Sequence, residues 1–358
     1  MSYYEIDFLA VETEKSGDAI PMRYEQNGVT IVHITDGGYL STGEAVVDHV
    51  TNLYGTTHVD HVVVTHPDGD HAAGLRVVLE SCTVGALWML RPWNYAAHVI
   101  HRFSTYNSVE RLQSKLKASY PNLAALEVMA IERGIPIYEP FQGSVIGNFT
   151  VMAPTVGRYL DLIVGSDKTP SAVTESASNF WGSVLRAAAN VVAYVKSAWG
   201  DESFPSNDTS AENEMSVIQF AYMEGHRILL TGDAGVEGLT EAINYAPMVG
   251  LTLPGLERVQ IPHHGSRRNV STDVLDRLLG PRLSAPVTPG YAQTLAIVSS
   301  AKADPKHPRK AVKRAFIHRG ADVYETEGNS IRIMGGAVPP RYGWGAVSPV
   351  AYPDEQEE

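Results

Sequence analysis

A continuous β-branched run constrains the fold of this 358-residue chain more than any other feature. The stretch VDHVVVTH, residues 59–66, is typical of a strand buried on both faces, because a half-exposed strand alternates apolar and polar residues. Such a strand needs other layers packed against both of its faces. Further strand-like and helix-like runs follow, which predicts mixed sheets covered by helices on their outer faces.

Four metal-ligand side chains follow this run within six residues: His66, Asp68, Asp70 and His71. Crowded into one loop, they would repel one another or stay unpaired unless a cation bound them. Imidazole and carboxylate together suit Zn²⁺, Mn²⁺ or Fe²⁺. The alternative is a polar turn in which Asp70 caps a helix, but capping needs only one of the four.

Two later segments repeat the order of apolar strand, ligand-type residue and glycine. In ILLTGDAG, residues 228–235, the strand ends at Asp233, and in RVQIPHHGS, residues 258–266, it ends at His263 and His264. Adjacent histidines point in different directions, so at most one of them is expected to bind a given metal. The shared position at strand ends predicts one site assembled from several loops.

Local patterns predict the surrounding elements. Asn27-Gly28 lies between two β-prone runs and predicts a hairpin. Leu112, Leu116 and Tyr120 recur at helical spacing, which predicts a helix over residues 108–133.

The domain organisation is predicted from a change in composition. An alanine-rich amphipathic helix over residues 178–196 is flanked by polar, loop-like segments. We interpret residues 157–211, approximately, as a helical and loop insertion in a single domain spanning 1–358. The acidic end, about residues 350–358, is expected to be disordered.

Charge and composition exclude several classes of protein. The single cysteine, Cys82, rules out an internal disulfide. No run approaches the roughly 18 apolar residues of a membrane span, and the N-terminus does not resemble a signal peptide, so we expect a cytoplasmic protein without a membrane partner. The net charge of −12 argues against a broad basic face for nucleic acid, but not against phosphate contacts confined to a metal-lined cleft.

Together these motifs resemble the metallo-β-lactamase fold. The variant His66-Pro67-Asp68-Gly69-Asp70-His71, with LLTGD and PHHGS, is most similar to the hydrolase domain of the ComEC-type competence (DNA-uptake) proteins. Weaker similarities occur in the same order along the chain: Gly17-Asp18-Ala19, Thr35-Asp36-Gly37-Gly38, Asn213 with Ser216, and His307-Pro308. The resemblance implies a four-layer αββα sandwich in which two mixed sheets are flanked by helices.

The resemblance also implies a ligand set. His66 and Asp68 would bind a first metal, Asp70 and His71 a second, and Asp233 would bridge the two. His264 would complete the second site, and Asp36 would hydrogen-bond the ligand loop.

Two positions depart from the family pattern. Asp68 replaces the usual second histidine of the ligand loop, and Asn213 stands where the histidine of the third motif belongs. Both changes favour oxygen ligation of the first metal, and hence Mn²⁺ or Mg²⁺ over Zn²⁺.

The implied activity is a metal-dependent phosphodiesterase or nuclease that uses a metal-bound hydroxide and one or two divalent ions (Zn²⁺ or Mn²⁺, with Mg²⁺ also allowed). Asp70 would orient the attacking group and His307 would protonate the leaving group. Residues expected to support the ligands or contact a phosphodiester such as DNA are Asn213, Ser216, His263, Ser266 and Arg267. The basic residues around 267–268 and 302–310 would either attract phosphate or be ordinary surface charges.

Three alternatives remain open. The same fold also hydrolyses small esters, lactones or thioesters, and a weakened first site would suit a non-catalytic binding module. The apolar side of residues 178–196 would form either a homodimer contact or a lid over the cleft.

Overall fold

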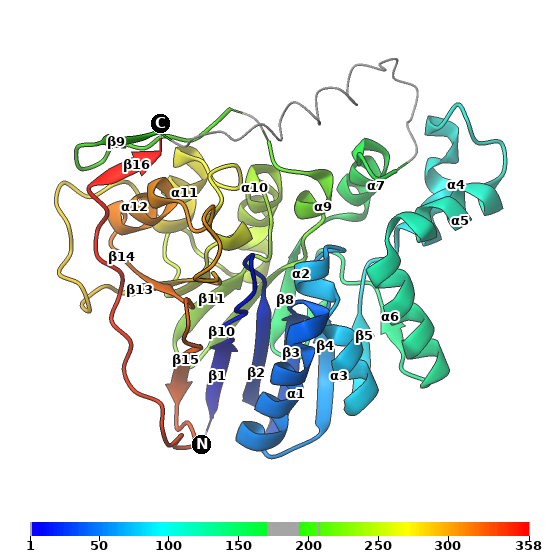
Figure 1. Ribbon diagram of the computed structural model, residues 1–358, viewed down its shortest axis with the longest axis horizontal. Coiled ribbons are helices and arrows are strands. Elements are labelled where there is room, and N and C mark those ends of the chain that lie inside the picture. Colours follow the sequence, from blue (N-terminus) through cyan, green and yellow to red (C-terminus); the bar gives the residue numbers. More distant parts are fainter. Residues whose placement is uncertain (1, 170–192, 207, 358) are drawn as a thin grey trace.

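The computed structural model describes residues 2–169, 193–206 and 208–357, and Figure 1 shows their arrangement. Two seven-stranded sheets lie at the centre, and a short two-stranded sheet, β9 and β16, lies apart. The strands are β1 (Tyr3–Phe8), β2 (Ala19–Gln26), β3 (Val29–Gly37), β4 (His58–Val63), β5 (Thr83–Trp88), β6 (Ile137–Tyr138), β7 (Val145–Ile146), β8 (Phe149–Ala153), β9 (Tyr194–Lys196), β10 (Ile218–Met223), β11 (His226–Leu230), β12 (Arg258–Gln260), β13 (Thr294–Val298), β14 (Ala321–Glu325), β15 (Ile331–Gly336) and β16 (Glu355–Glu357).

Helices connect these strands. The α-helices are α1 (Gly43–His49), α2 (Gly69–Ala72), α3 (Leu75–Ser81), α4 (Ala96–Val99), α5 (Val109–Ser119), α6 (Pro121–Glu132), α7 (Val156–Gly165), α9 (Ala211–Glu214), α10 (Val236–Tyr245), α11 (Thr272–Leu279) and α12 (Lys310–His318). Shorter turns of 3₁₀ or π geometry are Leu40–Thr42, Val50–Tyr54, Pro92–Tyr95, Ile100–Arg102, Ala246–Val249 and His263–Gly265. None of the helices in the described part of the chain is both long and apolar enough to cross a membrane.

The two large sheets share one plan. The first has the order β15-β1-β2-β3-β4-β5-β6, antiparallel as far as β3 and parallel from β3 to β6. The second has the order β7-β8-β10-β11-β12-β13-β14, antiparallel as far as β11 and parallel beyond it. In each sheet, two adjacent parallel strands therefore carry their carboxyl ends to the same edge: β3 with β4, and β11 with β12.

Three apolar cores separate the layers. Ile6 and Met22 from the first sheet pack with Phe149 and Ile228 from the second in the layer between the sheets. Leu229, the neighbour of Ile228, belongs instead to the core beneath α10, α11 and α12, as expected where a strand is covered on both faces.

Helices cover the opposite side as well. In Figure 1, α1, α3 and α6 lie beside the first sheet, and α10, α11 and α12 lie beside the second. These layers make an αββα sandwich of two mixed sheets flanked by helices, and the predicted layer arrangement is confirmed.

Two local predictions have different outcomes. The Asn27-Gly28 hairpin is confirmed, since Gln26 pairs with Val29 across the β2–β3 turn. The single helix predicted over 108–133 is wrong, because the chain breaks into α5 and α6 at Tyr120, which has φ −123° and ψ 67°. The residue before a proline is sterically excluded from helical conformation, and Pro121 starts the second helix.

The acidic end also differs from expectation. Instead of being disordered, Glu355–Glu357 forms β16, which pairs with β9. The Glu357 carboxylate accepts hydrogen bonds from the backbone N–H groups of Lys310 and Ala311, both 2.9 Å, and so caps α12. Free N–H groups at a helix start attract an anion, which explains why acidic residues are ordered there.

The insertion predicted at about 157–211 is described only in part. The helix predicted over residues 178–196 falls mostly outside the described residues, and its last three residues form strand β9 rather than a helix. At the start of the segment, α7 buries Tyr159 and Ile163 in the core of the first sheet. The division into one domain with an insertion stays a prediction.

Candidate metal centre

Loops that follow adjacent parallel strands bring the predicted ligands together. Asp36 lies near the end of β3, and the loop after β4 carries residues 66–71. Asp233 follows β11, and His263 and His264 follow β12. These side chains come together because each pair of parallel strands ends at the same edge of its sheet.

One compact group of ligand atoms comes from Asp18, His71, Asp233 and His264. One ligand atom from each lies within 4.8 Å of the others, and all four residues are buried. His71 Nε2 is 3.2 Å and His264 Nε2 is 3.9 Å from Asp233 Oδ1. Asp70 reaches the same group, with its Oδ2 3.7 Å from His264 Nε2.

A second group faces the other oxygen of Asp233. His66 Nε2 lies 3.7 Å from Asp233 Oδ2, and His263 Nε2 lies 3.6 Å from it. Asp68 is at the edge of this group, because its Oδ2 is 4.0 Å from His66 Nε2 and its side chain is 33% exposed. Asp233 therefore stands between two groups of ligands, as a bridging carboxylate must.

Buried polar atoms without hydrogen-bond partners test whether a metal fits. Among the described residues, 17 buried side-chain atoms form no hydrogen bond, and five of them gather here: Asp18 Oδ1, His66 Nε2, His71 Nε2, Asp233 Oδ1 and His264 Nε2. Leaving one such atom unpaired costs about 1–3 kcal/mol, and native proteins contain few of them. Five in one cluster of nitrogen and oxygen donors are explained if they bind a divalent cation.

Hydrogen bonds behind the imidazoles orient them toward the cluster. His71 Nδ1 lies 2.8 Å from Asp36 Oδ2, and His264 Nδ1 lies 3.0 Å from the carbonyl oxygen of Ser299. Thr65 Oγ1 donates to Asp36 at 2.6 Å and lies 3.0 Å from His66 Nδ1, so it accepts from that ring. In all three rings Nδ1 therefore carries a proton, and Nε2, which faces the cluster, is the nitrogen that can bind a metal once it is deprotonated.

Burial and neighbouring charges set the pKa values of the cluster. Burial alone would lower the pKa of His71, but Asp233 and Asp36 raise it well above its usual value. Burial would also lower the pKa of His264, but Asp233 and Asp70 raise it to about 9. Burial raises the pKa of Asp233, but His71 and the other histidines hold it well below its usual range. A metal that binds here must displace protons from these imidazoles.

Positive backbone φ angles mark three of the residues that build the cluster. Asp36 has φ 58°, His263 has φ 47° and His264 has φ 53°. Non-glycine residues rarely adopt this left-handed conformation, and it persists only where the surroundings enforce it. Gly74 is required for a different reason, because a Cβ there would lie 1.9 Å from the carbonyl oxygen of Gly37.

The structure reveals one residue that the predicted ligand set omits. Asp18 is buried, its Oδ2 accepts from Gln260 Nε2 at 2.9 Å, and it lies 3.7 Å from His71 Nδ1. Burial raises its pKa despite the nearby histidines. The motif Gly17-Asp18-Ala19 was the available signal, but nothing in the local sequence indicates that this segment meets the ligand loops.

The other predicted residues lie around the cluster in supporting positions. Ser216 Oγ accepts from the backbone N–H of Asp233 at 3.1 Å. Asn213 Nδ2 lies 3.1 Å from His263 Nδ1. Ser266 is buried, and its Oγ accepts from Arg268 N at 3.4 Å, so it supports its own loop.

His307 lies beside the cluster, with its ring centroid 5.6 Å from that of His263. Burial, together with His264 and His263, lowers its pKa to about 4. Its Nδ1 is 3.2 Å from Asp304 Oδ2. Backbone hydrogen bonds from Lys306 and Ser16, together with His307, outweigh the effect of burial and lower the pKa of Asp304 to about 2. Near neutral pH the His307 ring is therefore uncharged and donates from Nδ1, so its predicted role as a proton donor stays a prediction.

Two cations lie at the edge of the site. Lys168 Nζ is 2.5 Å from Asp68 Oδ1, and both side chains are partly exposed. Arg267 is partly buried, and its pKa is lowered by burial and by Arg309 while Glu357 raises it. Asp68 thus has a counter-ion already, which agrees with its outlying position in the ligand set.

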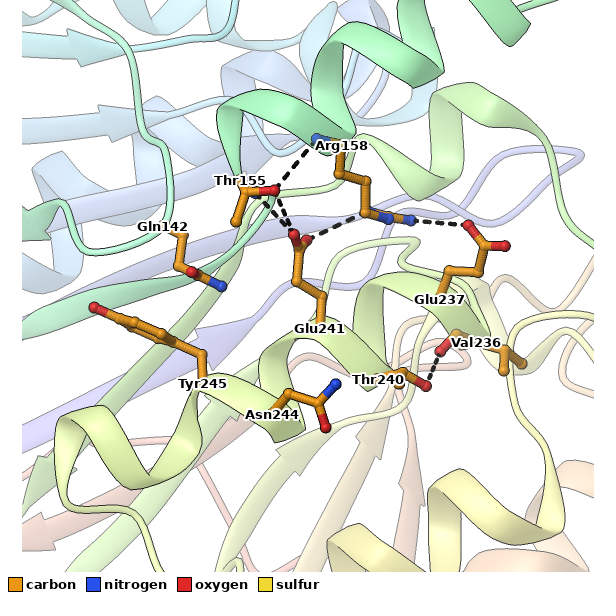
Figure 2. Close-up of a pocket in the computed structure, with 9 residues that line it drawn as sticks. All are labelled: Gln142, Thr155, Arg158, Val236, Glu237, Thr240, Glu241, Asn244 and Tyr245. Atoms are coloured by element: carbon orange, nitrogen blue, oxygen red, sulfur yellow. Dashed lines mark hydrogen bonds and ion pairs between the residues drawn. The ribbon is translucent and has the colours of Figure 1, made fainter.

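A separate cavity of about 520 Å³ lies between α7 and α10 and contains none of the predicted ligands. Figure 2 shows Arg158 and Thr155 pointing toward Glu241. Thr155 Oγ1 donates to Glu241 at 2.7 Å, and Arg158 Nη1 is 3.6 Å from it. The charged groups of this cavity form ion pairs with one another, and none of the residues that line it is a histidine, in contrast to the metal cluster.

No family model and no curated protein matches this sequence. Similar solved structures include a hydrolase of the beta-lactamase superfamily, AbOPH, at 10% identity and TM-score 0.30, with 60% of this chain and 56% of that chain covered. A putative metallo-beta-lactamase from Thermotoga maritima has 12% identity, TM-score 0.28 and coverage of 65% and 81%. A diphosphatase of the PhnP family has 9% identity, TM-score 0.38 and coverage of 93% and 98%. The chain thus spans just over half of the first, and likeness at this level carries no information on what the chain binds or cleaves.

Proposed function

We propose that this protein is a metal-dependent hydrolase of phosphodiesters. The observation that carries the proposal is the set of five buried, unpaired donor atoms from Asp18, His66, His71, Asp233 and His264. Those residues would hold a divalent metal, which when bound would supply a water of lowered pKa and a positive charge to polarise a phosphoryl oxygen.

The chain's own residues supply the geometry for this reaction. Asp36, Thr65 and the carbonyl of Ser299 hold the three imidazoles so that their Nε2 atoms face the cluster. Asp70 is partly buried and its Oδ2 lies 3.7 Å from His264 Nε2, where it could accept a hydrogen bond from an attacking water. Burial raises the pKa of Asp70, but His264 and His71 outweigh this and keep the carboxyl ionised, as an acceptor must be.

Two observations support a phosphodiester as the substrate. The motifs HPDGDH, LLTGD and PHHGS resemble those of the ComEC-type hydrolase domain, and partly exposed cations, including Lys168 and Arg309, lie in segments that border the ligand loops. Such cations attract phosphate oxygens. DNA is the proposed polymer substrate.

The net charge of −12 favours one competing reading, a hydrolase of small esters, lactones or thioesters, because a small neutral substrate is not repelled. The Lys168–Asp68 contact favours another, a binding module whose first metal site is weakened. Incubation with single-stranded DNA and Mn²⁺, alongside a lactone and a thioester, separates the three readings.

Removal of a central ligand tests the proposal directly. We expect purified protein with Mn²⁺ or Zn²⁺ to cleave bis-p-nitrophenyl phosphate and single-stranded DNA. His71→Ala and Asp70→Ala should abolish turnover while circular dichroism and Tm show a folded chain. A protein that cleaves neither DNA, RNA nor bis-p-nitrophenyl phosphate with any divalent metal would refute the proposal, and full activity in both variants would refute the assigned site.

A further inference from the structure

We infer that His263 is a ligand of the first metal, in the place of the third-motif histidine that the sequence lacks. The inference rests on the proposed function only in requiring that the chain binds divalent metal. The resemblance to known motifs assigns His264 alone, and His263 was expected to contact substrate or support other ligands. The geometry around Asp233 points to both histidines as ligands, each for a different metal.

Asp233 has two imidazole nitrogens near each of its carboxylate oxygens. Oδ1 faces His71 and His264 at 3.2 and 3.9 Å. Oδ2 faces His66 and His263 at 3.7 and 3.6 Å. Separations of this size are expected between ligands that share a metal at roughly 2.0–2.2 Å from each. His263 Nε2 therefore lies about as far from Oδ2 as the Nε2 atoms of the second-site histidines lie from Oδ1.

The tautomer of His263 is fixed by Asn269. The amide nitrogen of Asn269 donates to the carbonyl oxygens of Asp233 and Ala234, at 2.7 and 3.3 Å. Its Oδ1 is thereby turned toward His263 Nδ1, at 2.8 Å, and can only accept. His263 must donate from Nδ1, which leaves the Nε2 lone pair directed toward Asp233. A polar partner on the far nitrogen is what orients a metal-binding histidine.

The backbone explains how adjacent histidines serve different metals. His263 and His264 are both left-handed, at φ 47° and 53°, and their rings lie 5.9 Å apart at 65° to each other. In this turn the two side chains diverge to opposite oxygens of one carboxylate. Two consecutive strained residues are a cost that a purely structural turn would avoid with glycine.

Asn213 takes part in the same arrangement. It occupies the sequence position of the missing third-motif histidine, and its Nδ2 lies 3.1 Å from His263 Nδ1. Both atoms are donors, so Nδ1 bonds to the nearer Asn269 Oδ1, and Asn213 Nδ2 donates to Thr209 Oγ1 at 2.7 Å instead. It is buried, and its backbone is held by the Ser210 cap of α9. The structure thus places Asn213 behind the ring of His263 rather than among the ligands that face Asp233.

The variant His263→Gly removes the imidazole and suits the left-handed backbone, so the turn is kept. The readout is metal content per chain after equilibrium dialysis against Mn²⁺ or Zn²⁺, together with the visible spectrum of the Co²⁺ form. We expect two ions per wild-type chain and one per His263→Gly chain, with first-site affinity lowered at least tenfold. The matched control is His307→Ala. The His307 side chain lies beside that of His263 and is similarly exposed, 21% against 26%, and its removal should leave two ions bound.

Each alternative result is decisive. Two ions bound to His263→Gly at unchanged affinity would overturn the inference and leave His263 facing substrate. A wild type with one ion would overturn it as well, whereas a wild type with none would also overturn the proposed function. Should His263→Gly fail to fold, His263→Asp decides instead, because aspartate tolerates the same backbone. It should retain two ions with a preference shifted from Zn²⁺ toward Mn²⁺, and an unchanged preference would contradict the inference.

Discussion

At the residue scale, Asp36 connects the ligand loop to the sheet. Its carboxylate accepts from the backbone N–H and hydroxyl of Thr65, at 2.9 and 2.6 Å, and from His71 Nδ1 at 2.8 Å. Asp36→Asn keeps the left-handed backbone but replaces one acceptor oxygen by a donor, which must then face another donor. We expect metal affinity to fall about 10- to 100-fold, as for other partners of metal-binding histidines. Calorimetric titration with Mn²⁺ measures the change.

Asp60→Asn is the matched control for this variant. Asp60 also accepts a backbone hydrogen bond within the first sheet, from Val32 N at 2.8 Å, but it lies outside the metal cluster. Its substitution should leave the affinity for Mn²⁺ unchanged. Equal affinities for wild type and Asp36→Asn would show that Asp36 does not support the ligand loop.

The residues of the site divide into those that the sequence predicts and those that only the fold reveals. The ligand loop at 66–71 and Asp233 were predictable because each follows an apolar strand directly. Asp18 was not, because its ligand-like position depends on a segment before β2 meeting a loop about 50 residues later. The direction of His263 depends on two consecutive left-handed residues, which no spacing rule predicts.

At the element scale, periodicity predicted strands and helices better than their ends. The Asn27-Gly28 turn was readable because two residues determine its geometry locally. The helix over 108–133 was predicted too long, because its apolar spacing continues across a break caused by Pro121. The pairing of β16, in the acidic tail, with β9 was not predictable, since the two strands lie far apart in the sequence.

Glu202 joins the segment after β9 to α11 and α12. Its carboxylate contacts Arg319 at 2.5 Å, Thr272 Oγ1 at 2.6 Å and His318 Nδ1 at 3.4 Å. Burial would raise its pKa, but His318 and Arg319 outweigh this and lower it to about 2. The carboxylate therefore stabilises the fold above about pH 4.5, and this contribution disappears as the pH falls toward 2.

Glu202→Gln should remove this stabilisation. At pH 7 we expect a loss of about 3 kcal/mol in the free energy of unfolding, because a buried guanidinium loses one of its two counter-ions. The urea unfolding midpoint should also vary less between pH 5 and pH 2 than in the wild type. Glu132→Gln, at an exposed position in α6, should stay within about 0.5 kcal/mol of the wild type. If the unfolding midpoint of Glu202→Gln fell as steeply with pH as that of the wild type, other carboxylates would be responsible for the acid dependence.

At the scale of the whole molecule, the acidic tail opposes the basic segment that should receive substrate. Glu357 caps α12 through Lys310 N and Ala311 N, Glu355 Oε2 lies 3.3 Å from Lys310 Nζ, and Glu357 also acts on Arg267. The acidic side chains that make up the net charge of −12 are therefore not spread evenly around the site, because two of them, in the tail, act on cations beside the ligand loops. The overall charge alone could not predict this, since the tail was expected to be disordered.

Deletion of residues 354–358 should remove the tail carboxylates that act on Lys310 and Arg267, so that both cations attract phosphate more strongly. We expect tighter binding of single-stranded DNA at low salt, with a logarithmic salt dependence steeper by about 1.4 if two further phosphates are neutralised. Fluorescence anisotropy of a labelled oligonucleotide, titrated with metal-free protein at several salt concentrations, measures the affinity and its salt dependence. Loss of the α12 cap should also lower the free energy of unfolding by about 1 kcal/mol. The control is Glu44→Gln, Asp48→Asn, Glu80→Gln and Glu132→Gln combined, which removes four carboxylates from exposed helix surfaces instead. If that control steepens the salt dependence as much as the deletion does, net charge rather than the tail's position governs binding, and the tail does not shield the site.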